Sequence, residues 1–283
     1  MSTLTITTIQ TDLQWENKSA NLKNIGEKID AITAITEIVI LPEMFSTGFS
    51  MEAKKLAETM EGITVQWMKE IAAKKKIILT GSVIIEDKGH YYNRLIWMLP
   101  NGQYGYYDKR HLFGLGNEDQ HYTAGNKRLI ASVKGWKINL QVCYDLRFPV
   151  WARNRAIEQD QHLKENGGQH IGNEEILPEL SPEYDVLIYV ANWPDKRSLA
   201  WKALLAARAI ENQCYVVGVN RVGKDGNELS YRGDSRVIDP MGEVLYHMAD
   251  NEDVHTITLQ KDKLEEIRTK LPFWKDGDGF HFQ

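Results

Sequence analysis

Residues 136–151 read WKINLQVCYDLRFPVW, an alternating strand that leads directly into the start of a helix. Because side chains in a strand alternate between two faces, Ile138, Leu140 and Val142 are predicted to share one face. Cys143 belongs to the other face, together with two amide side chains, near the carboxyl end of the strand. Backbone N–H groups of the following turn are expected close by, where a developing oxyanion could be held. The stretch leaves two interpretations of Cys143, an inert buried thiol or a nucleophile.

Strands and helices alternate on both sides of this stretch. Strands are predicted at 4–10, 37–43, 76–85, 91–99, 103–109, 128–133, 136–145, 184–193, 214–222, 231–240, 242–248 and 253–259. Helices are predicted at 16–36, 54–76, 148–159, 198–213 and 261–270. Two strand-rich halves, each with a pair of helices, predict an α+β fold, a four-layer α-β-β-α sandwich. A doubly wound sheet is the alternative that the pattern leaves open.

The chain of 283 residues is predicted to form a single domain over 1–283. Residues 158–183 are rich in acidic and amide side chains and contain a Gly-Gly pair, which predicts a polar surface insertion. His162 and His170 are interpreted as solvated residues of that insertion. The tail at 271–283 carries four aromatic residues among glycines, and we expect it to dock on the body or on a second subunit.

Composition and charge exclude several classes of function. The formal net charge is -5 and no basic run is present, so the chain lacks the electrostatic signature of a protein that binds nucleic acid or a membrane surface. Neither a signal peptide nor a membrane span is indicated, so a cytoplasmic protein is expected. Cys143 and Cys214 are predicted to be free thiols. Without a metal-binding spacing or a glycine-rich phosphate loop, no metal and no cofactor are expected.

Two further residues with complementary chemistry stand at strand ends. Glu43 follows the apolar run IVIL and a proline, and Lys109 closes the strand predicted at 103–109. A thiol nucleophile needs a group that takes its proton or stabilises its thiolate. Taken singly, Glu43 is either a turn residue or a site residue, and Lys109 is either a solvated lysine or a site cation. Their shared position at strand ends favours one site that contains Cys143, Glu43 and Lys109.

Three segments resemble the signatures of one enzyme family. LPEMFSTGF around Glu43, YDKRHLF around Lys109 and VCYDLRFP around Cys143 occur in the order found in the nitrilase, or carbon-nitrogen hydrolase, superfamily. The resemblance covers nearly the whole chain and includes QTDLQW, ANWP, ARAIENQCYVVGVNR and GDSRVIDPMGEVL. Within the superfamily the sequence is most similar to bacterial omega-amidases, which act on amides of 2-oxo acids. The resemblance implies a cofactor-free amidase with a small-molecule amide substrate, and a homodimer or larger homo-oligomer.

The resemblance also implies a role for each catalytic residue. Cys143 would be the nucleophile, Glu43 its general base, and Lys109 the cation that stabilises the tetrahedral intermediate. The second glutamate of the family matches Glu118, with Asp119 as the neighbouring alternative. Its role would be to orient Lys109 and to help manage protons.

Substrate contacts are implied on the same rim of the fold. The backbone N–H of Tyr144 would donate to the oxyanion. Arg147, four residues after the cysteine, offers a forked donor for a substrate carboxylate, and the alternative is a structural arginine paired with Asp145. The other implied pocket residues are Phe45, His121, Tyr122, Asn192 and Trp193.

Three competing interpretations remain. In a Cys-His enzyme of papain type, His111 or His121 would serve Cys143, and loss of Lys109 would be mild. Another carbon-nitrogen hydrolase, such as an N-carbamoyl amino acid amidohydrolase or an aliphatic amidase, would keep the catalytic residues and differ in its acyl pocket. A non-catalytic scaffold of the same fold would leave Cys143 slow to react, but the filled acid, base, cation and thiol positions weaken that interpretation.

Overall fold

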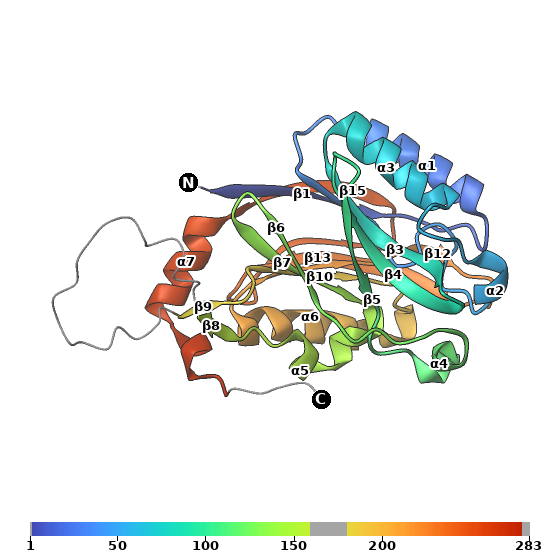
Figure 1. Ribbon diagram of the computed structural model, residues 1–283. Coiled ribbons are helices and arrows are strands. Elements are labelled where there is room, and N and C mark those ends of the chain that lie inside the picture. Colours follow the sequence, from blue (N-terminus) through green and yellow to red (C-terminus); the bar gives the residue numbers. More distant parts are fainter. Residues whose placement is uncertain (1, 159–179, 279–283) are drawn as a thin grey trace.

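Two β-sheets lie face to face at the centre of the molecule (Figure 1). The computed structural model describes residues 2–158 and 180–278. In these residues the first sheet has six strands, in the order β15 (Asp253–Gln260), β1 (Thr3–Gln10), β2 (Ile38–Ile40), β3 (Ile78–Asp87), β4 (His90–Met98) and β5 (Tyr104–Asp108). The second sheet has the order β12 (Val222–Lys224), β13 (Ser230–Ile238), β11 (Tyr215–Val219), β10 (Val186–Val190), β7 (Trp136–Val142) and β6 (Leu129–Val133), and β14 (Val244–Ala249) pairs with β13.

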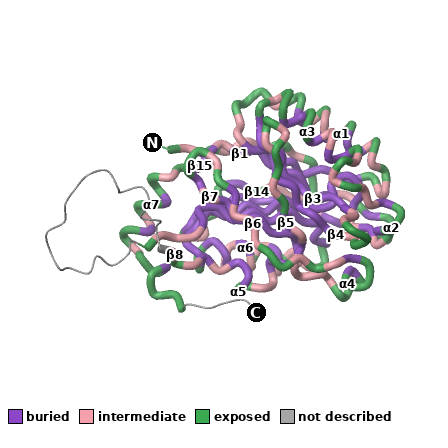
Figure 2. Tube along the Cα trace, viewed as in Figure 1, coloured by how far each residue is buried: buried purple, intermediate pink, exposed green. Residues whose placement is uncertain are grey.

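Helices cover the outer faces of both sheets. α1 (Lys18–Asp30) and α3 (Ile63–Lys75) lie together over the first sheet, and α6 (Ser198–Asn212) covers the second (Figure 1). The shorter elements, with the C-terminal helix, are α2 (Ala53–Leu56), α4 (Glu118–His121), α5 (Pro149–Ala152), α7 (Lys261–Lys270), and the 3-10 turns η1 (Gly114–Gly116), η2 (Cys143–Arg147), η4 (Asp195–Arg197) and η5 (Phe273–Asp276). Burial is concentrated in the strands, while the helices expose their outer sides (Figure 2). In the described parts of the chain, no helix is both long and apolar enough to cross a membrane.

Successive side chains of a strand point to opposite faces of its sheet, so the apolar side chains are divided between the core that lies between the sheets and the core beneath the helices. In β2, Ile38 and Ile40 join the core between the sheets, whereas Val39 joins the core beneath α1 and α3. In β7, Leu140 and Val142 extend the core between the sheets toward the second sheet. The predicted four-layer sandwich is therefore confirmed. The doubly wound alternative is wrong, because the strands form two sheets with apolar packing between them.

Three of the predicted helices were wrong in part, and the one predicted at 16–36 ends at Asp30. The helix predicted at 148–159 ends at Ala152, and β8 (Ala156–Glu158) pairs instead with β9 (Leu180–Pro182). Asn154 explains the break, because its backbone N–H and side-chain amide are bound to Asn212 and to the carbonyl of Tyr184. The side chain thereby fixes the backbone in a conformation that does not continue the helix.

The helix predicted at 54–76 is interrupted between α2 and α3. Glu58 forms a β-bridge with Ile85, and its backbone N–H donates to the carbonyl of Ile84 at 3.1 Å. The chain between the helices therefore pairs with β3. The apolar spacing of the sequence does not reveal this tertiary pairing.

Two segments singled out in the sequence are described only in part. Residues 159–179 of the predicted insertion, with His162 and His170, lie outside the described residues, as do Phe280 and Phe282. In the described part of the tail, Trp274 is buried and its backbone N–H donates to the Gln213 side chain.

The topology brings several strand ends to one edge of the sandwich. In the second sheet β7 and β10 run parallel with Val142 opposite Val190, so the residues that follow them, Cys143 and Asn192, lie side by side. In the first sheet Glu43 follows β2 and meets Asn192 through a 2.7 Å hydrogen bond. The candidate site therefore lies at the seam between the two sheets.

Gly218 in β11 allows α6 to pack closely on the second sheet. A Cβ at this position would lie 2.5 Å from Leu205 Cδ1 and 2.8 Å from Trp201 Cζ2. We expect Gly218→Ala to lower the free energy of unfolding by about 1–3 kcal/mol, the range for overpacking a filled core. Denaturant unfolding measures this change. Gly26→Ala in α1 is the matched control, since its Cβ would meet Trp67 only at 3.8 Å and alanine favours a helix. Equal stabilities of the two variants would contradict the prediction.

Candidate active site

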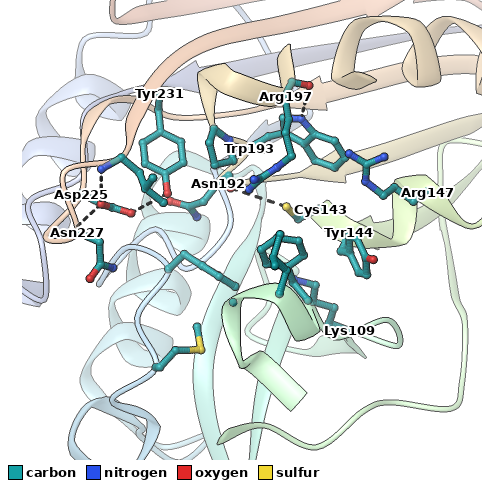
Figure 3. A pocket seen from close by; sticks show the side chains of 17 residues that line it. Lys109, Cys143, Tyr144, Arg147, Asn192, Trp193, Arg197, Asp225, Asn227 and Tyr231 are labelled. Atoms are coloured by element: carbon teal, nitrogen blue, oxygen red, sulfur yellow. Dashed lines mark hydrogen bonds between the residues drawn. The ribbon is translucent and has the colours of Figure 1, made fainter. Parts of the chain in front are cut away.

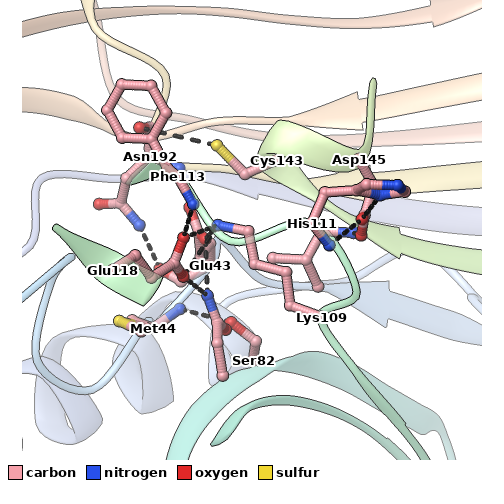
Figure 4. A network of polar contacts seen from close by, with 12 residues as sticks. Glu43, Met44, Ser82, Lys109, His111, Phe113, Glu118, Cys143, Asp145 and Asn192 are labelled. Carbon is pink, nitrogen blue, oxygen red and sulfur yellow. Dashed lines mark hydrogen bonds and ion pairs between the residues drawn. The ribbon is translucent and has the colours of Figure 1, made fainter. Parts of the chain in front are cut away.

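A lysine and two glutamates, each with a fully buried side chain, form the base of the site. Lys109 follows β5 and donates to Glu43 Oε1 at 2.9 Å (Figure 4). It also donates to both carboxylate oxygens of Glu118, at 3.0 and 2.8 Å. The side chains of all three residues are 0% exposed. The structure thus brings together three predicted residues from the end of β2, the end of β5 and the start of α4.

Neighbouring N–H groups share the negative charge of the two carboxylates. Asn93 Nδ2 lies 2.8 Å from Glu43 Oε1 and 3.2 Å from Glu118 Oε1, and it donates to both. The backbone N–H of Asn192 donates to Glu43 Oε2 at 2.7 Å, and that of Phe113 donates to Glu118 Oε2 at 2.6 Å. Every carboxylate oxygen of the pair therefore accepts at least one hydrogen bond, which fixes both groups in position.

The network shifts the titration of its members. Burial alone would lower the pKa of Lys109, but the adjacent charges of Glu118 and Glu43 outweigh it and raise that pKa. Burial raises the pKa of Glu118, against the opposing charge of Lys109. The lysine is thus held as a cation under all ordinary conditions.

Cys143 stands above this network in a strained backbone conformation. Its φ is 45°, which places a residue with a side chain in the left-handed region at the first position of η2. Its Sγ points to the carbonyl oxygen of Asn192 at 3.9 Å. Burial raises the pKa of the Cys143 thiol, the charge of Glu43 adds to the increase, and Lys109 opposes it. At neutral pH the resting site therefore holds a thiol, and attack on a substrate requires a base that accepts its proton.

The side chain of His111 is hydrogen-bonded to Asp145. Its Nδ1 lies 2.8 Å from Asp145 Oδ1, and its ring stacks on Phe148 with 3.8 Å between centroids. None of its contacts among the described residues is with Cys143. This arrangement is evidence against a Cys-His pair of papain type.

A cavity of about 220 Å³ opens over Cys143 (Figure 3). This volume is below the range for drug-sized ligands, about 300–1,000 Å³, so the cavity has the size of a site for a small molecule. Six predicted site residues line it, namely Lys109, Cys143, Tyr144, Arg147, Asn192 and Trp193. The apolar wall is formed by Phe49, Met51, Phe113, Leu115 and Leu229.

Three other predicted pocket residues lie outside this lining. Phe45 is fully buried in the core under the first sheet, and its ring centroid is 5.9 Å from that of Trp67. Tyr122 is buried and donates its hydroxyl to the backbone of Ser50 at 2.5 Å. His121 ends α4 on the exposed surface.

Arg147 is not the partner of Asp145. Both oxygens of Asp145 are occupied, since Oδ1 binds His111 while Oδ2 accepts from the Tyr107 hydroxyl and the Val142 N–H. The Arg147 guanidinium carbon lies 5.0 Å from the centroid of the Trp193 ring. The structural pairing considered from the sequence is therefore absent, and the guanidinium faces the cavity.

The sequence did not identify several residues of the site. Asn93, which bridges the two glutamates, stands in β4 as an amide within the segment YYNRLIWML, and its polarity in a buried strand was the available signal. Arg197 and the pair Asp225 and Tyr231 also line the cavity. Nothing in their local sequence distinguishes them from surface residues, because only tertiary packing brings them to Cys143. In the part of the chain that the structure describes, no group of three His, Cys, Asp or Glu side chains is arranged to hold a metal ion.

Comparisons with known proteins agree with this geometry. The carbon-nitrogen hydrolase family matches residues 5–269. Omega-amidase YafV of Escherichia coli (strain K12) is 42% identical over 285 aligned positions, which cover 99% of both chains. A 2-oxoglutaramate amidase of Bacillus subtilis is 30% identical over 96% of both chains. The crystal structure of a CN-hydrolase superfamily protein from Xanthomonas campestris, with an arsenic adduct in its active site, superposes with a TM-score of 0.89 at 43% identity over 100% of both chains.

The charge of Glu43 should control the reactivity of Cys143. A carboxylate beside a thiol disfavours the thiolate, so Glu43→Gln is expected to lower the pKa of Cys143. The rate of Cys143 alkylation by iodoacetamide is measured as a function of pH. The pH at which this rate rises should be lower in Glu43→Gln than in the parent protein. Both proteins should carry Cys214→Ala, so that Cys143 is the only thiol. A pH midpoint equal to or above that of the parent would contradict this prediction.

Proposed function

The chain belongs to the carbon-nitrogen hydrolase family, and from this premise we propose that it is an omega-amidase. Such an enzyme hydrolyses the terminal amide of small 2-oxo dicarboxylate monoamides to the acid and ammonia. The observation that carries the proposal is the buried contact of Lys109 with Glu43 and Glu118 beneath Cys143. The similarity to omega-amidases over 99% of both chains supports the substrate class.

In the proposed reaction Glu43 takes the proton of Cys143, and Sγ attacks the amide carbonyl carbon. The carbonyl oxygen becomes an oxyanion, which the charge of Lys109 and the backbone N–H of Tyr144 stabilise. The N–H of Tyr144 lies in the first turn of η2, where helix N–H groups have no acceptor inside the helix. A donor of this kind contributes about 3–4 kcal/mol to lowering a barrier.

The second half of the reaction returns the enzyme to its resting state. Glu43 gives its proton to the leaving nitrogen as the carbon-nitrogen bond breaks, ammonia departs, and an acyl thioester remains on Cys143. Glu43 then takes a proton from water, and the hydroxide attacks the thioester carbonyl. Collapse of that intermediate releases the acid, and the thiolate regains its proton from Glu43. Glu118 positions Lys109 throughout, through both of its carboxylate oxygens.

Arg147 supports the preference for an amide that also carries a carboxylate. Its guanidinium lies over the Trp193 ring at the edge of the cavity, and it has no carboxylate partner among the described residues. A forked donor in this state suits a substrate carboxylate. N-carbamoyl amino acids carry the same group, so the substrate assay must include them.

The reaction depends on Cys143 and not on the second thiol. Wild-type protein is expected to release ammonia from 2-oxoglutaramate or 2-oxosuccinamate faster than from butyramide, an N-carbamoyl amino acid or a nitrile. Cys143→Ala should abolish this release, because no other group can form the thioester. Cys214→Ala is the control, since Cys214 is fully buried in the core. Near wild-type turnover by Cys143→Ala would refute the mechanism, and a preference for carbamoyl compounds would refute the substrate class.

A homo-oligomer in the cytoplasm completes the proposal. Leu199 and Ile210 are 80% and 54% exposed on α6, and their spacing of eleven residues puts them on the same face of the helix. Such a pair supports contact with a second copy through α6. Sedimentation velocity should give at least the mass of a dimer, and Leu199→Glu with Ile210→Glu should shift it toward the monomer. A wild-type monomer at micromolar concentration would contradict this part of the proposal.

A further inference from the structure

Two arginines that have no carboxylate partner in the described ranges line the cavity. Arg147 closes η2 and Arg197 closes η4; the Arg197 side chain runs toward Asn192 and Cys143, whereas the Arg147 guanidinium lies beside the Trp193 ring (Figure 3). Each guanidinium carbon lies 5.0 Å from an aromatic centroid, that of Trp193 for Arg147 and that of Phe113 for Arg197. Among the described residues, neither guanidinium makes an ion pair or a side-chain hydrogen bond.

Two acids close to Arg197, one in the sequence and one in the cavity lining, are engaged elsewhere. Asp195, two residues before it, lies 3.8 Å from Arg232 Nε. Asp225, which shares the cavity, accepts the Tyr231 hydroxyl at 2.8 Å and two backbone N–H groups. Among the described residues, no carboxylate therefore pairs with the guanidinium of Arg197, and its donors are available to a ligand.

The backbone of Arg197 is fixed where its side chain enters the cavity. Its carbonyl accepts the indole N–H of Trp193 at 2.8 Å, and its N–H donates to the carbonyl of Pro194 at 3.0 Å. The same Trp193 ring supports Arg147. One tryptophan thus holds the two arginines on one side of the cavity, at the ends of loops that follow the parallel strands β7 and β10.

We propose that Arg197 donates to the 2-oxo oxygen of the substrate and thereby selects 2-oxo monoamides over their 2-amino counterparts. This inference rests on the proposed function and gives the second arginine a role distinct from that of Arg147. A 2-oxo carboxylate presents three oxygens on adjacent carbons, and two forked cations provide donors for both groups. The ammonium of a 2-amino acid has no lone pair to accept a hydrogen bond, and its positive charge would face a guanidinium.

Three five-carbon monoamides separate the two arginines. 2-Oxoglutaramate has both the oxo group and the carboxylate, glutaramate has only the carboxylate, and L-glutamine carries an ammonium in place of the oxo group. For Arg197→Gln, the ratio of kcat/KM for 2-oxoglutaramate to that for glutaramate should fall roughly tenfold to a hundredfold, which corresponds to one charge-assisted hydrogen bond. The ratio of 2-oxoglutaramate to L-glutamine should fall further. Arg147→Gln should lower kcat/KM for all three monoamides by a similar factor and leave the ratios unchanged.

Two further variants complete the test. Arg197→Lys keeps the charge but loses the fork, so it should retain rejection of L-glutamine while the ratio of 2-oxoglutaramate to glutaramate falls. If Arg197→Gln does not fold, as judged by thermal unfolding, this ratio in Arg197→Lys decides the question. Lys196→Gln, at the neighbouring exposed position, is the control for a change of charge outside the cavity.

The outcomes distinguish this inference from the function on which it rests. Unchanged ratios in both Arg197 variants, or an equal loss on all three substrates, would overturn the role of Arg197 while the omega-amidase activity of the wild type stands. A wild type that releases no ammonia from 2-oxoglutaramate or 2-oxosuccinamate but hydrolyses other amides would overturn the proposed function itself.

Discussion

The contact of Lys109 with two buried carboxylates is the constraint on which the rest of the structure depends. Removing an ion from water costs several kcal/mol, and a buried pair is stable only when its geometry is good and its remaining lone pairs are bonded. Here two negative charges meet one positive charge, so the cluster carries an excess negative charge. Asn93 and the backbone N–H groups of Phe113 and Asn192 compensate for it with four hydrogen bonds in all. A shift of any one of these elements would remove a hydrogen bond that helps to compensate the buried charge.

The same network joins the two sheets. Glu43 belongs to the first sheet, yet its Oε2 accepts the N–H of Asn192 from the second, and its backbone carbonyl accepts the Asn192 amide at 2.5 Å. Because Cys143 follows β7 and Asn192 follows the adjacent β10, strand register sets the position of Cys143, the proposed nucleophile, relative to Glu43, the proposed base. The packing of the two sheets therefore determines the geometry of the site. A change that slid the sheets would move Glu43 away from Cys143.

The sequence predicted the fold class because strand periodicity, turn signals and the motif set all agree. Strand-end positions singled out Glu43, Lys109 and Cys143, and the structure brings all three together. The parity argument for Cys143 was less sound, since β7 ends at Val142 and a φ of 45° redirects the next side chain. The sequence did not predict that Asn93 and Arg197 belong to the site, because their positions there depend on contacts between elements that are distant in the sequence. Local patterns record periodicity and turns, but they do not record which buried amide meets which carboxylate.

The cationic side chains of the site differ in whether they are paired with a carboxylate. The Nζ of Lys109 lies within hydrogen-bond distance of Glu43 Oε1 and of both carboxylate oxygens of Glu118, so its charge is paired with two carboxylates in the resting structure. In the proposed mechanism this changes when Glu43 accepts the thiol proton, because a neutral carboxyl is a weaker acceptor than a carboxylate. The N–H that Glu43 then holds less firmly becomes available to the oxyanion in the same step that creates it. Arg147 and Arg197 have no carboxylate partner among the described residues, so they can bind a substrate before any proton moves. In the proposed mechanism, these two arginines would therefore bind the substrate first, and the paired Lys109 would act in the chemical step that follows.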